Sequence, residues 1–134
     1  MKVIVCIDDG LGMMFNKRRQ SRDRVLCADV VRDLDGETLA IAPYSLLLFE
    51  STGAKLSVSD APFATDAKVA FIENLPLLVH KDEICEMVVY RWNRRYPADV
   101  HLDLLPWEHG FVLKESSEFV GSSHEKITKE VYAR

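Results

Sequence analysis

The chain has 134 residues, of which 48% are hydrophobic and 28% charged, values that are ordinary for a single globular domain. Its formal net charge of −4 argues against a domain that binds nucleic acid over its whole surface, because such domains are basic. Its apolar runs are too short to span a membrane, and its three cysteines are scattered and form no CxxC pair. We therefore expect one cytoplasmic α/β domain over residues 1–134, with reduced thiols, no metal site and no membrane contact.

The N-terminal third predicts a strand, a loop and a helix. Lys2–Ile7 is a β-branched run closed by Asp8-Asp9-Gly10, as expected for a buried strand followed by a turn. A helix is predicted to begin at Ser21, whose hydroxyl would cap the first free N–H groups, with Asp23 in the first turn where the helix dipole favours a carboxylate. Asp35-Gly36 would end it. The apolar face of this helix comprises Leu26, Cys27, Val30, Val31 and Leu34.

The rest of the chain reads mainly as short strands, which predicts a mixed sheet with few helices. Tyr44–Phe49 is either a short helix or a continued strand, and His80–Glu86 is either a connector or one helical turn. In the strand Glu86–Trp92, the alternation of side chains places Tyr90 and Trp92 on one face and Arg91 on the other. The predicted strands are Thr38–Ala42, Leu56–Val58, Val69–Ile72, Glu86–Trp92 and Val100–Leu104, followed by a closing pair, Phe111–Leu113 and Ile127–Tyr132, joined through Ser116–Lys126.

Two arginine-rich groups stand out in an otherwise acidic chain. The first lies in Gly10–Asp23 and just beyond it, next to the predicted start of the helix, where free N–H groups favour an anion. The second follows the strand Glu86–Trp92. Each is either a solvated charge run or part of one site for an anionic ligand or for nucleic acid, and the sequence does not show whether they meet. The first group contains Arg18, Arg19, Arg22 and Arg24 with Asn16, Gln20 and Ser21, and the second contains Arg91, Arg94 and Arg95 with Asn93 and Tyr96.

Two further positions carry chemistry-bearing side chains. Glu73-Asn74 follows the predicted strand Val69–Ile72, and ligands of open α/β sheets bind at strand ends, although a simple turn is the alternative. His124 lies in a Ser-Ser-His-Glu loop. Adjacency alone does not supply the geometry of a Ser-His-acid triad, so none is predicted.

The order of these elements resembles dihydrofolate reductase in a shortened form. A strand opens onto the loop Leu11-Gly12-Met13, which leads to a helix with Asp23 in its first turn, close to the family's spacing from its mobile loop to its catalytic carboxylate. The segment MVVYRWNRRYPADVHLDLLPW resembles the family's strand, turn and strand ahead of its closing hairpin, and SSHEKITKEVYAR resembles its final strand. The resemblance implies Asp23 as a proton donor and NADPH as a cofactor; a plain helix-terminal charge is the alternative for Asp23.

The turns that hold the cofactor in that family differ in this chain. Ala42-Pro43-Tyr44-Ser45 takes the place of a Gly-Arg-x-Thr turn, and Phe71–Pro76 has no glycine where the family has a glycine-rich turn. Side chains there would obstruct a close approach of cofactor to backbone. We therefore predict no cofactor, with NADPH disfavoured.

The segments GMMFNKRRQSRDR and GSSHEKITKE resemble a second family, short proteins of Gram-positive gut bacteria labelled ribonuclease Z. The label implies a nuclease with two zinc ions. Such a site needs several converging imidazole and carboxylate ligands, whereas the four histidines here are singly placed.

The sequence thus predicts a small-ligand-binding domain on a dihydrofolate reductase-like scaffold, with a nucleotide- or pterin-like anion as ligand. A divergent NADPH-dependent reductase that uses Asp23 is one alternative, and an RNA-directed nuclease or binder is another. Whether the chain is an enzyme, and its oligomeric state, stay open. The candidate site residues are Asn16, Arg19, Gln20, Ser21 and Asp23, with Glu73 and Asn74 opposite them and Arg91 and Arg94 from the second arginine group.

Overall fold

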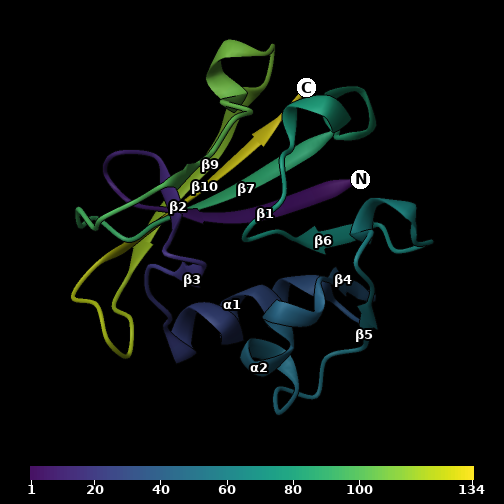
Figure 1. Cartoon of the computed structure of the whole chain (residues 1–134), viewed down its shortest axis with the longest axis horizontal. Helices are drawn as coiled ribbons and strands as arrows, with labels where there is room; N and C mark the ends of the chain where they lie inside the picture. Colours follow the sequence, from purple (N-terminus) through teal and green to yellow (C-terminus); the bar gives the residue numbers. More distant parts are fainter.

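A seven-stranded mixed sheet forms the centre of the computed structural model, which describes all 134 residues (Figure 1). Its strand order is β5-β4-β6-β1-β7-β10-β9. Neighbours from β5 to β7 are parallel, whereas β10 is antiparallel to β7 and β9, so the carboxyl ends of five strands share one edge of the sheet. The strands are β1 (Lys2–Ile7), β4 (Leu39–Ile41), β5 (Leu56–Val58), β6 (Val69–Phe71), β7 (Glu86–Arg91), β9 (Val112–Phe119) and β10 (Ile127–Ala133).

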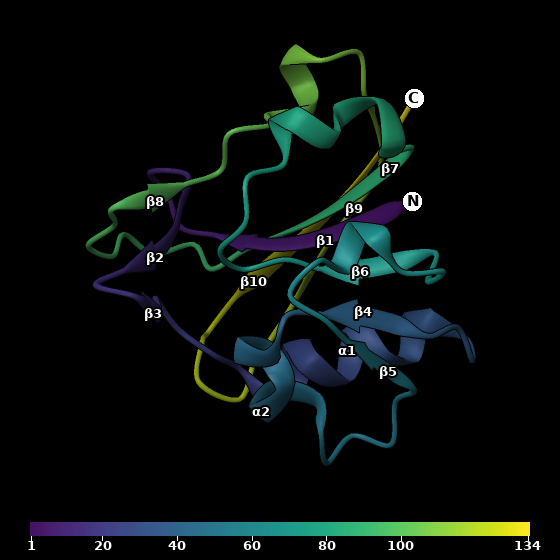
Figure 2. The ribbon, with the colours of Figure 1, turned by 45° about the vertical axis from the view of Figure 1, so that its right-hand side comes forward.

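Two helices cover one face of this sheet, α1 (Arg24–Leu34) and the short α2 (Leu46–Phe49), as Figure 2 shows beside β4 and β5. The 3₁₀ turn η1 (Pro43–Ser45) leads into α2, so the ambiguous segment Tyr44–Phe49 is helical. Helix α1 ends at Leu34, next to the predicted stop at Asp35-Gly36, and its C-cap Asp35 is left-handed with φ 49°. Apolar side chains of both helices pack on those of the strands; the large ones include Leu26, Val30, Phe49, Phe71, Tyr90 and Trp92.

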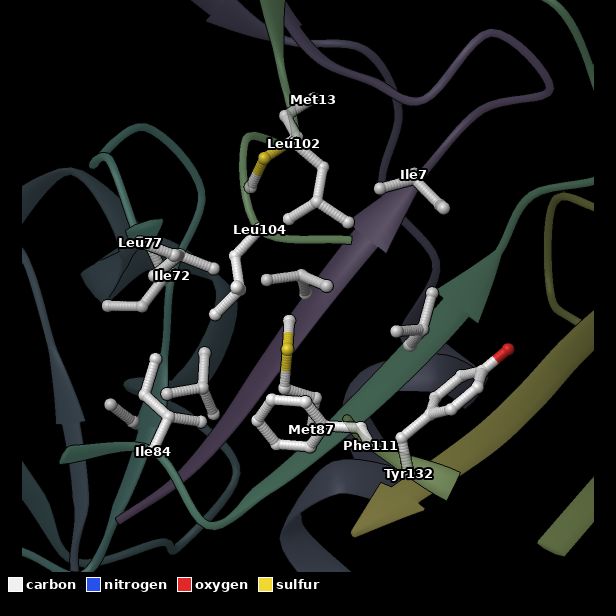
Figure 3. Close-up of a cluster of buried hydrophobic side chains, with 14 of the residues drawn as sticks. Ile7, Met13, Ile72, Leu77, Ile84, Met87, Leu102, Leu104, Phe111 and Tyr132 are labelled. Carbon is white, nitrogen blue, oxygen red and sulfur yellow. The ribbon is translucent and has the colours of Figure 1, made fainter. Parts of the chain in front are cut away.

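The opposite face is covered by loops, 3₁₀ turns and a small second sheet, and holds a separate apolar cluster (Figure 3). The second sheet has the order β3-β2-β8, with β2 (Gly12–Phe15), β3 (Arg18–Arg19) and β8 (Val100–His101). The remaining turns are η2 (Pro62–Ala64), η3 (Leu78–Glu83) and η4 (Pro106–Glu108). Residues labelled in Figure 3 include Met13, Leu77, Ile84, Met87, Leu104 and Phe111.

Several predicted boundaries need correction. Helix α1 begins at Arg24, and its cap is Asp23 rather than Ser21. The loop Gly10–Asp23 contains β2 and β3, which the sequence did not indicate. Val100–Leu104 is a strand over two residues only, and the strand predicted at Phe111–Leu113 extends to Phe119 as β9 because it pairs along β10.

The predictions for the two faces of β7 and for membrane-spanning segments can also be compared with the structure. Tyr90 and Trp92 are buried in the helix-side core, and Arg91 points to the other face, as the alternation predicted. No helix is long and apolar enough to cross a membrane.

Candidate functional site

Polar side chains from distant parts of the chain meet at the carboxyl edge of the parallel strands. They come from the ends of β1 and β6, from the segment before α1, from η1, and from the loop that joins β9 to β10. The register of β10 against β7 places Thr128 opposite Arg91, which brings that loop to the same edge. Edges of this kind are where open α/β sheets bind ligands.

Asp23 is the most heavily bonded side chain of the site, and its carboxylate is fully buried. Oδ1 accepts from the N–H groups of Val25 at 2.9 Å and Leu26 at 3.2 Å, which caps α1. It also accepts from Ser122 N–H at 2.9 Å, while Oδ2 accepts from Ser123 N–H at 2.8 Å. Asp23 therefore ties the start of α1 to the β9–β10 loop.

The acidity of Asp23 follows from these contacts. Burial alone raises the pKa of the carboxyl, but the hydrogen bonds from His124 and from the N–H groups of Ser123, Ser122 and Leu26 outweigh it. The pKa lies well below its ordinary value, so Asp23 is ionised at neutral pH. A carboxyl held in this state accepts hydrogen bonds and has no proton to give, which argues against the role of proton donor.

His124 lies beside Asp23 with only 2% of its side chain exposed. Its Nδ1 is 2.9 Å from Asp23 Oδ2, and its ring stacks on Trp92 with centroids 4.5 Å apart. Since an ionised carboxylate only accepts, Nδ1 carries a hydrogen, and in the neutral ring Nε2 is an acceptor. Two hydroxyls lie within hydrogen-bond distance of Nε2, Ser21 Oγ at 2.9 Å and Tyr96 Oη at 3.2 Å.

A second charged pair, Arg19 and Glu73, lies at the end of β6. Arg19 Nε and Nη2 donate to the two carboxylate oxygens at 2.9 and 3.1 Å, and the side chains are only 16% and 9% exposed. Ser45 Oγ donates to the same carboxylate at 2.7 Å. Tyr44 contributes its carbonyl to Arg19 Nη2 and its ring, whose centroid is 4.4 Å from the guanidinium carbon. The pair therefore joins β3 and η1 to the end of β6.

An enclosed pocket lies between these two groups, with room for about one water molecule at about 20 Å³. Burial, followed by the negative charges of Glu73 and Asp23, raises the pKa of the Cys27 thiol to about 11. Burial, Glu73 and Cys27 likewise raise the pKa of Cys6 well above its ordinary value. Both thiols are therefore neutral and unreactive at neutral pH. The apolar walls of this pocket include Met13, Leu26, Leu48, Phe71, Ile72 and Trp92.

An open groove of about 760 Å³ lies beside this pocket, between α1, α2 and the β9–β10 loop. Arg22, Asp23, Cys27 and Leu48 border both spaces, so the two are adjacent. The guanidinium groups of Arg22 and Arg24 form no salt bridge. The rest of the groove carries the polar residues Ser51, Thr52, Ser122, Ser123 and Arg32 and the apolar residues Ala28, Val31 and Leu47.

The structure brings together some of the residues predicted from the sequence. Arg19, Gln20, Ser21, Asp23 and Glu73 all line the enclosed pocket.

Other predicted residues lie away from that pocket. Asn16 is exposed in a turn with φ 51°, and its N–H donates to Asp99. Arg91 is paired with Glu130 on β10 at 2.7 Å. Asn74 and Arg94 line neither the pocket nor the groove.

No pattern in the sequence indicates His124 as a partner of Ser21 and Asp23. It is 101 residues from Asp23, and only the pairing of β10 with β7 and β9 brings it close. The Ser-Ser-His-Glu loop was visible, but nothing in it indicated which acid and which hydroxyl it would meet.

The ends of β4 and β6 carry other groups than the cofactor-holding turns of the family that the sequence resembles. At the end of β6, Glu73 places a buried carboxylate that is already bound by Arg19 and Ser45. At the end of β4, Pro43 has no N–H to donate.

Gly121 marks the tightest packing around Asp23, and its replacement by alanine should be destabilising. A Cβ at this position would lie 2.3 Å from Asp23 Oδ2 and 2.9 Å from Ile127 Cδ1, so the buried carboxylate or the loop has to shift. We expect Gly121→Ala to lower the free energy of unfolding by about 2 kcal/mol, as overpacking does. Urea unfolding of this variant beside Gly10→Ala, where a Cβ would meet only ordinary contacts with Asp8 Oδ1 at 3.6 Å and Arg95 Nη1 at 3.8 Å, would measure it. Equal stability of Gly121→Ala and the wild type would show that the loop yields without cost.

Comparison with known proteins shows the fold. No family model matches the chain, and no curated protein matches it in sequence. Among solved structures, a dihydrofolate reductase of Enterococcus faecalis in complex with NADP(H) and RAB-propyl is similar, with a TM-score of 0.64 over 99% of this chain and 95% of that one. The identity is 10%, so this likeness concerns the fold alone. The chain therefore has a dihydrofolate reductase-like fold, a single α/β domain with a mixed sheet and few helices, as the sequence predicted.

Proposed function

We propose that this chain is a small-ligand-binding protein and that its ligand, an anion of nucleotide- or pterin-like size, lies in the groove between α1 and α2. The observation that carries the proposal is the pair Arg22 and Arg24 at the mouth of that groove. The buried charged side chains of the site already have partners. Arg19 is paired with Glu73, and Asp23 accepts hydrogen bonds from His124 and four N–H groups. Two cations without a carboxylate partner are what an incoming anion would meet.

The groove also suits the remainder of such a ligand. Its volume of about 760 Å³ is within the range of small-molecule sites, and it is lined by both apolar side chains and hydroxyl groups. Cys27, Ala28 and Val31 would contact a flat ring, while Ser51, Thr52 and Ser122 offer hydrogen bonds. The enclosed pocket behind it is too small for a ring system at about 20 Å³.

A thermal melting screen tests the proposal. AMP, GMP, ATP, folate and inorganic phosphate would each be added to the full chain, and a ligand at one hundred times its dissociation constant should add about 2.7 kcal/mol to the free energy of unfolding. For a domain of this size that corresponds to a rise in Tm of about 10 °C. The shift should be lost in the double variant Arg22→Ala, Arg24→Ala.

Arg18→Ala is the matched control, because Arg18 is an exposed cation of the same segment that does not line the groove. It should keep the full shift. If the control and the double variant lose the ligand-induced rise in Tm equally, the effect is general charge attraction, and the proposed site in the groove is wrong. Steep salt dependence with short RNA, and no shift with any small anion, would instead favour the nucleic-acid alternative.

A further inference from the structure

We propose that Ser21, His124 and Asp23 form a nucleophile, base and positioning acid, and that the chain hydrolyses short-chain acyl esters. This goes beyond ligand binding, and it does not depend on the groove's anionic ligand. The structure assigns the three roles by hydrogen bonds: Ser21 Oγ to His124 Nε2 at 2.9 Å, and His124 Nδ1 to Asp23 Oδ2 at 2.9 Å. A hydroxyl bound to an imidazole that a buried carboxylate orients is the arrangement that activates serine in hydrolases of several unrelated folds.

The protonation states required by this chemistry follow from the surroundings. Asp23 is ionised and accepts five hydrogen bonds, so it fixes the hydrogen of the imidazole on Nδ1. Nε2 is then free to accept the hydroxyl proton of Ser21. Trp92 stacks on the ring and holds its plane, and the 2% exposure of the His124 side chain keeps water from competing for Nε2.

The surroundings of Ser21 also suit an ester. Ser21 is half-buried and lines the enclosed pocket, whose volume of about 20 Å³ behind it accepts a group the size of an acetyl methyl and nothing much larger. The alcohol portion would extend into the open groove. The backbone N–H groups of Ser21 and Arg22 donate to no group of the chain, which leaves them available to an oxyanion.

The reaction needs water as its only co-reactant. Ser21 Oγ bonds to the carbonyl carbon of the ester while its proton passes to His124 Nε2. Collapse of the tetrahedral intermediate breaks the bond to the alcohol oxygen, which leaves with that proton. A water molecule then attacks the acyl-serine with the same base, which releases the carboxylic acid and restores Ser21.

Replacing Tyr96 distinguishes a nucleophilic Ser21 from a Ser21 with a purely structural role. Its hydroxyl is the second donor near Nε2, at 3.2 Å, and it competes with Ser21 for the same lone pair. Tyr96→Phe removes this competitor while keeping the backbone N–H that donates to Asp8. If Ser21 is a nucleophile, Tyr96→Phe should react at least as fast as the wild type.

The experiment is covalent labelling of the full chain with phenylmethylsulfonyl fluoride and with a fluorophosphonate, followed by intact mass and peptide mapping. We expect one adduct on Ser21, none in Ser21→Ala, and a rate at least 100-fold lower in His124→Gln, the effect of losing a general base. Ser117→Ala, which removes an exposed hydroxyl on β9, should label like the wild type. Circular dichroism melting of each variant establishes that it is folded.

Hydrolysis of p-nitrophenyl acetate and p-nitrophenyl hexanoate gives the second measurement. The acetate should be cleaved by the wild type and not by Ser21→Ala, and the hexanoate should be cleaved at least tenfold more slowly because the pocket is small. No adduct on Ser21 with either reagent, or equal ester cleavage by folded Ser21→Ala, would overturn the proposal. Because both probes are neutral, these outcomes are separate from those of the anion screen.

Discussion

Replacing Asp23 by alanine is expected to lower the free energy of unfolding by about 4 kcal/mol. The loss of a helix cap costs about 1 kcal/mol by itself. The change also leaves the part-buried N–H groups of Ser122 and Ser123 and the buried imidazole of His124 without an acceptor, and together these unsatisfied groups add about 3 kcal/mol. Urea unfolding at neutral pH would measure the difference. Asp9→Ala, at an exposed aspartate just beyond the end of β1, should stay within about 0.5 kcal/mol of the wild type.

The contribution of Asp23 should also depend on pH. Its pKa is lowered on folding, so the stability it provides is present above the unfolded pKa of about 3.9 and is lost as pH falls toward the lower folded pKa. In a His124→Gln background, the difference in free energy of unfolding between the protein with Asp23 and its Asp23→Ala variant should narrow from pH 5 to pH 3. If this difference in free energy of unfolding stays constant over that pH range, the charge of Asp23 does not contribute to stability.

Replacing Glu73 by alanine is expected to cost about 3 kcal/mol. Glu73 and Arg19 are a largely buried pair with two hydrogen bonds between them, and removing one partner leaves an uncompensated charge in the protein. Ser45 Oγ also loses its acceptor. Equilibrium unfolding in urea gives the value. The exposed pair Lys126 and Glu118 is the matched control, and Glu118→Ala should change stability by less than about 0.5 kcal/mol.

A double variant tests whether stability at this position requires the two charges or only the volume of the two side chains. Arg19→Met with Glu73→Leu keeps similar volume and removes both charges, so it should be more stable than Glu73→Ala, by about 2 kcal/mol. A double variant as unstable as the single one would show that the site requires the charges themselves.

The sequence alone determined much of the fold. The β-branched run Lys2–Ile7, the apolar face of α1 and the alternation around Tyr90 each specify a local structure, because the burial of side chains at period 2 or 3.6 is a local property of the chain. The turn at Asp35-Gly36 was likewise predictable, since a left-handed residue ends the helix there. The sequence also shows directly that Pro43 and Glu73 differ from the residues of the cofactor-binding turns in the family it resembles.

The site was decided by the tertiary structure. That Asp23 would bind the β9–β10 loop, that Arg19 would be neutralised by Glu73, and that His124 would meet Ser21 all depend on contacts between residues 54 to 103 positions apart. Such contacts follow from strand order and register, in particular from β10 inserting between β7 and β9. A local pattern contains no information on that register, because the apolar faces of several strands would satisfy the same alternation. Packing of the whole sheet therefore selected which charges were paired and which, Arg22 and Arg24, were left at the surface.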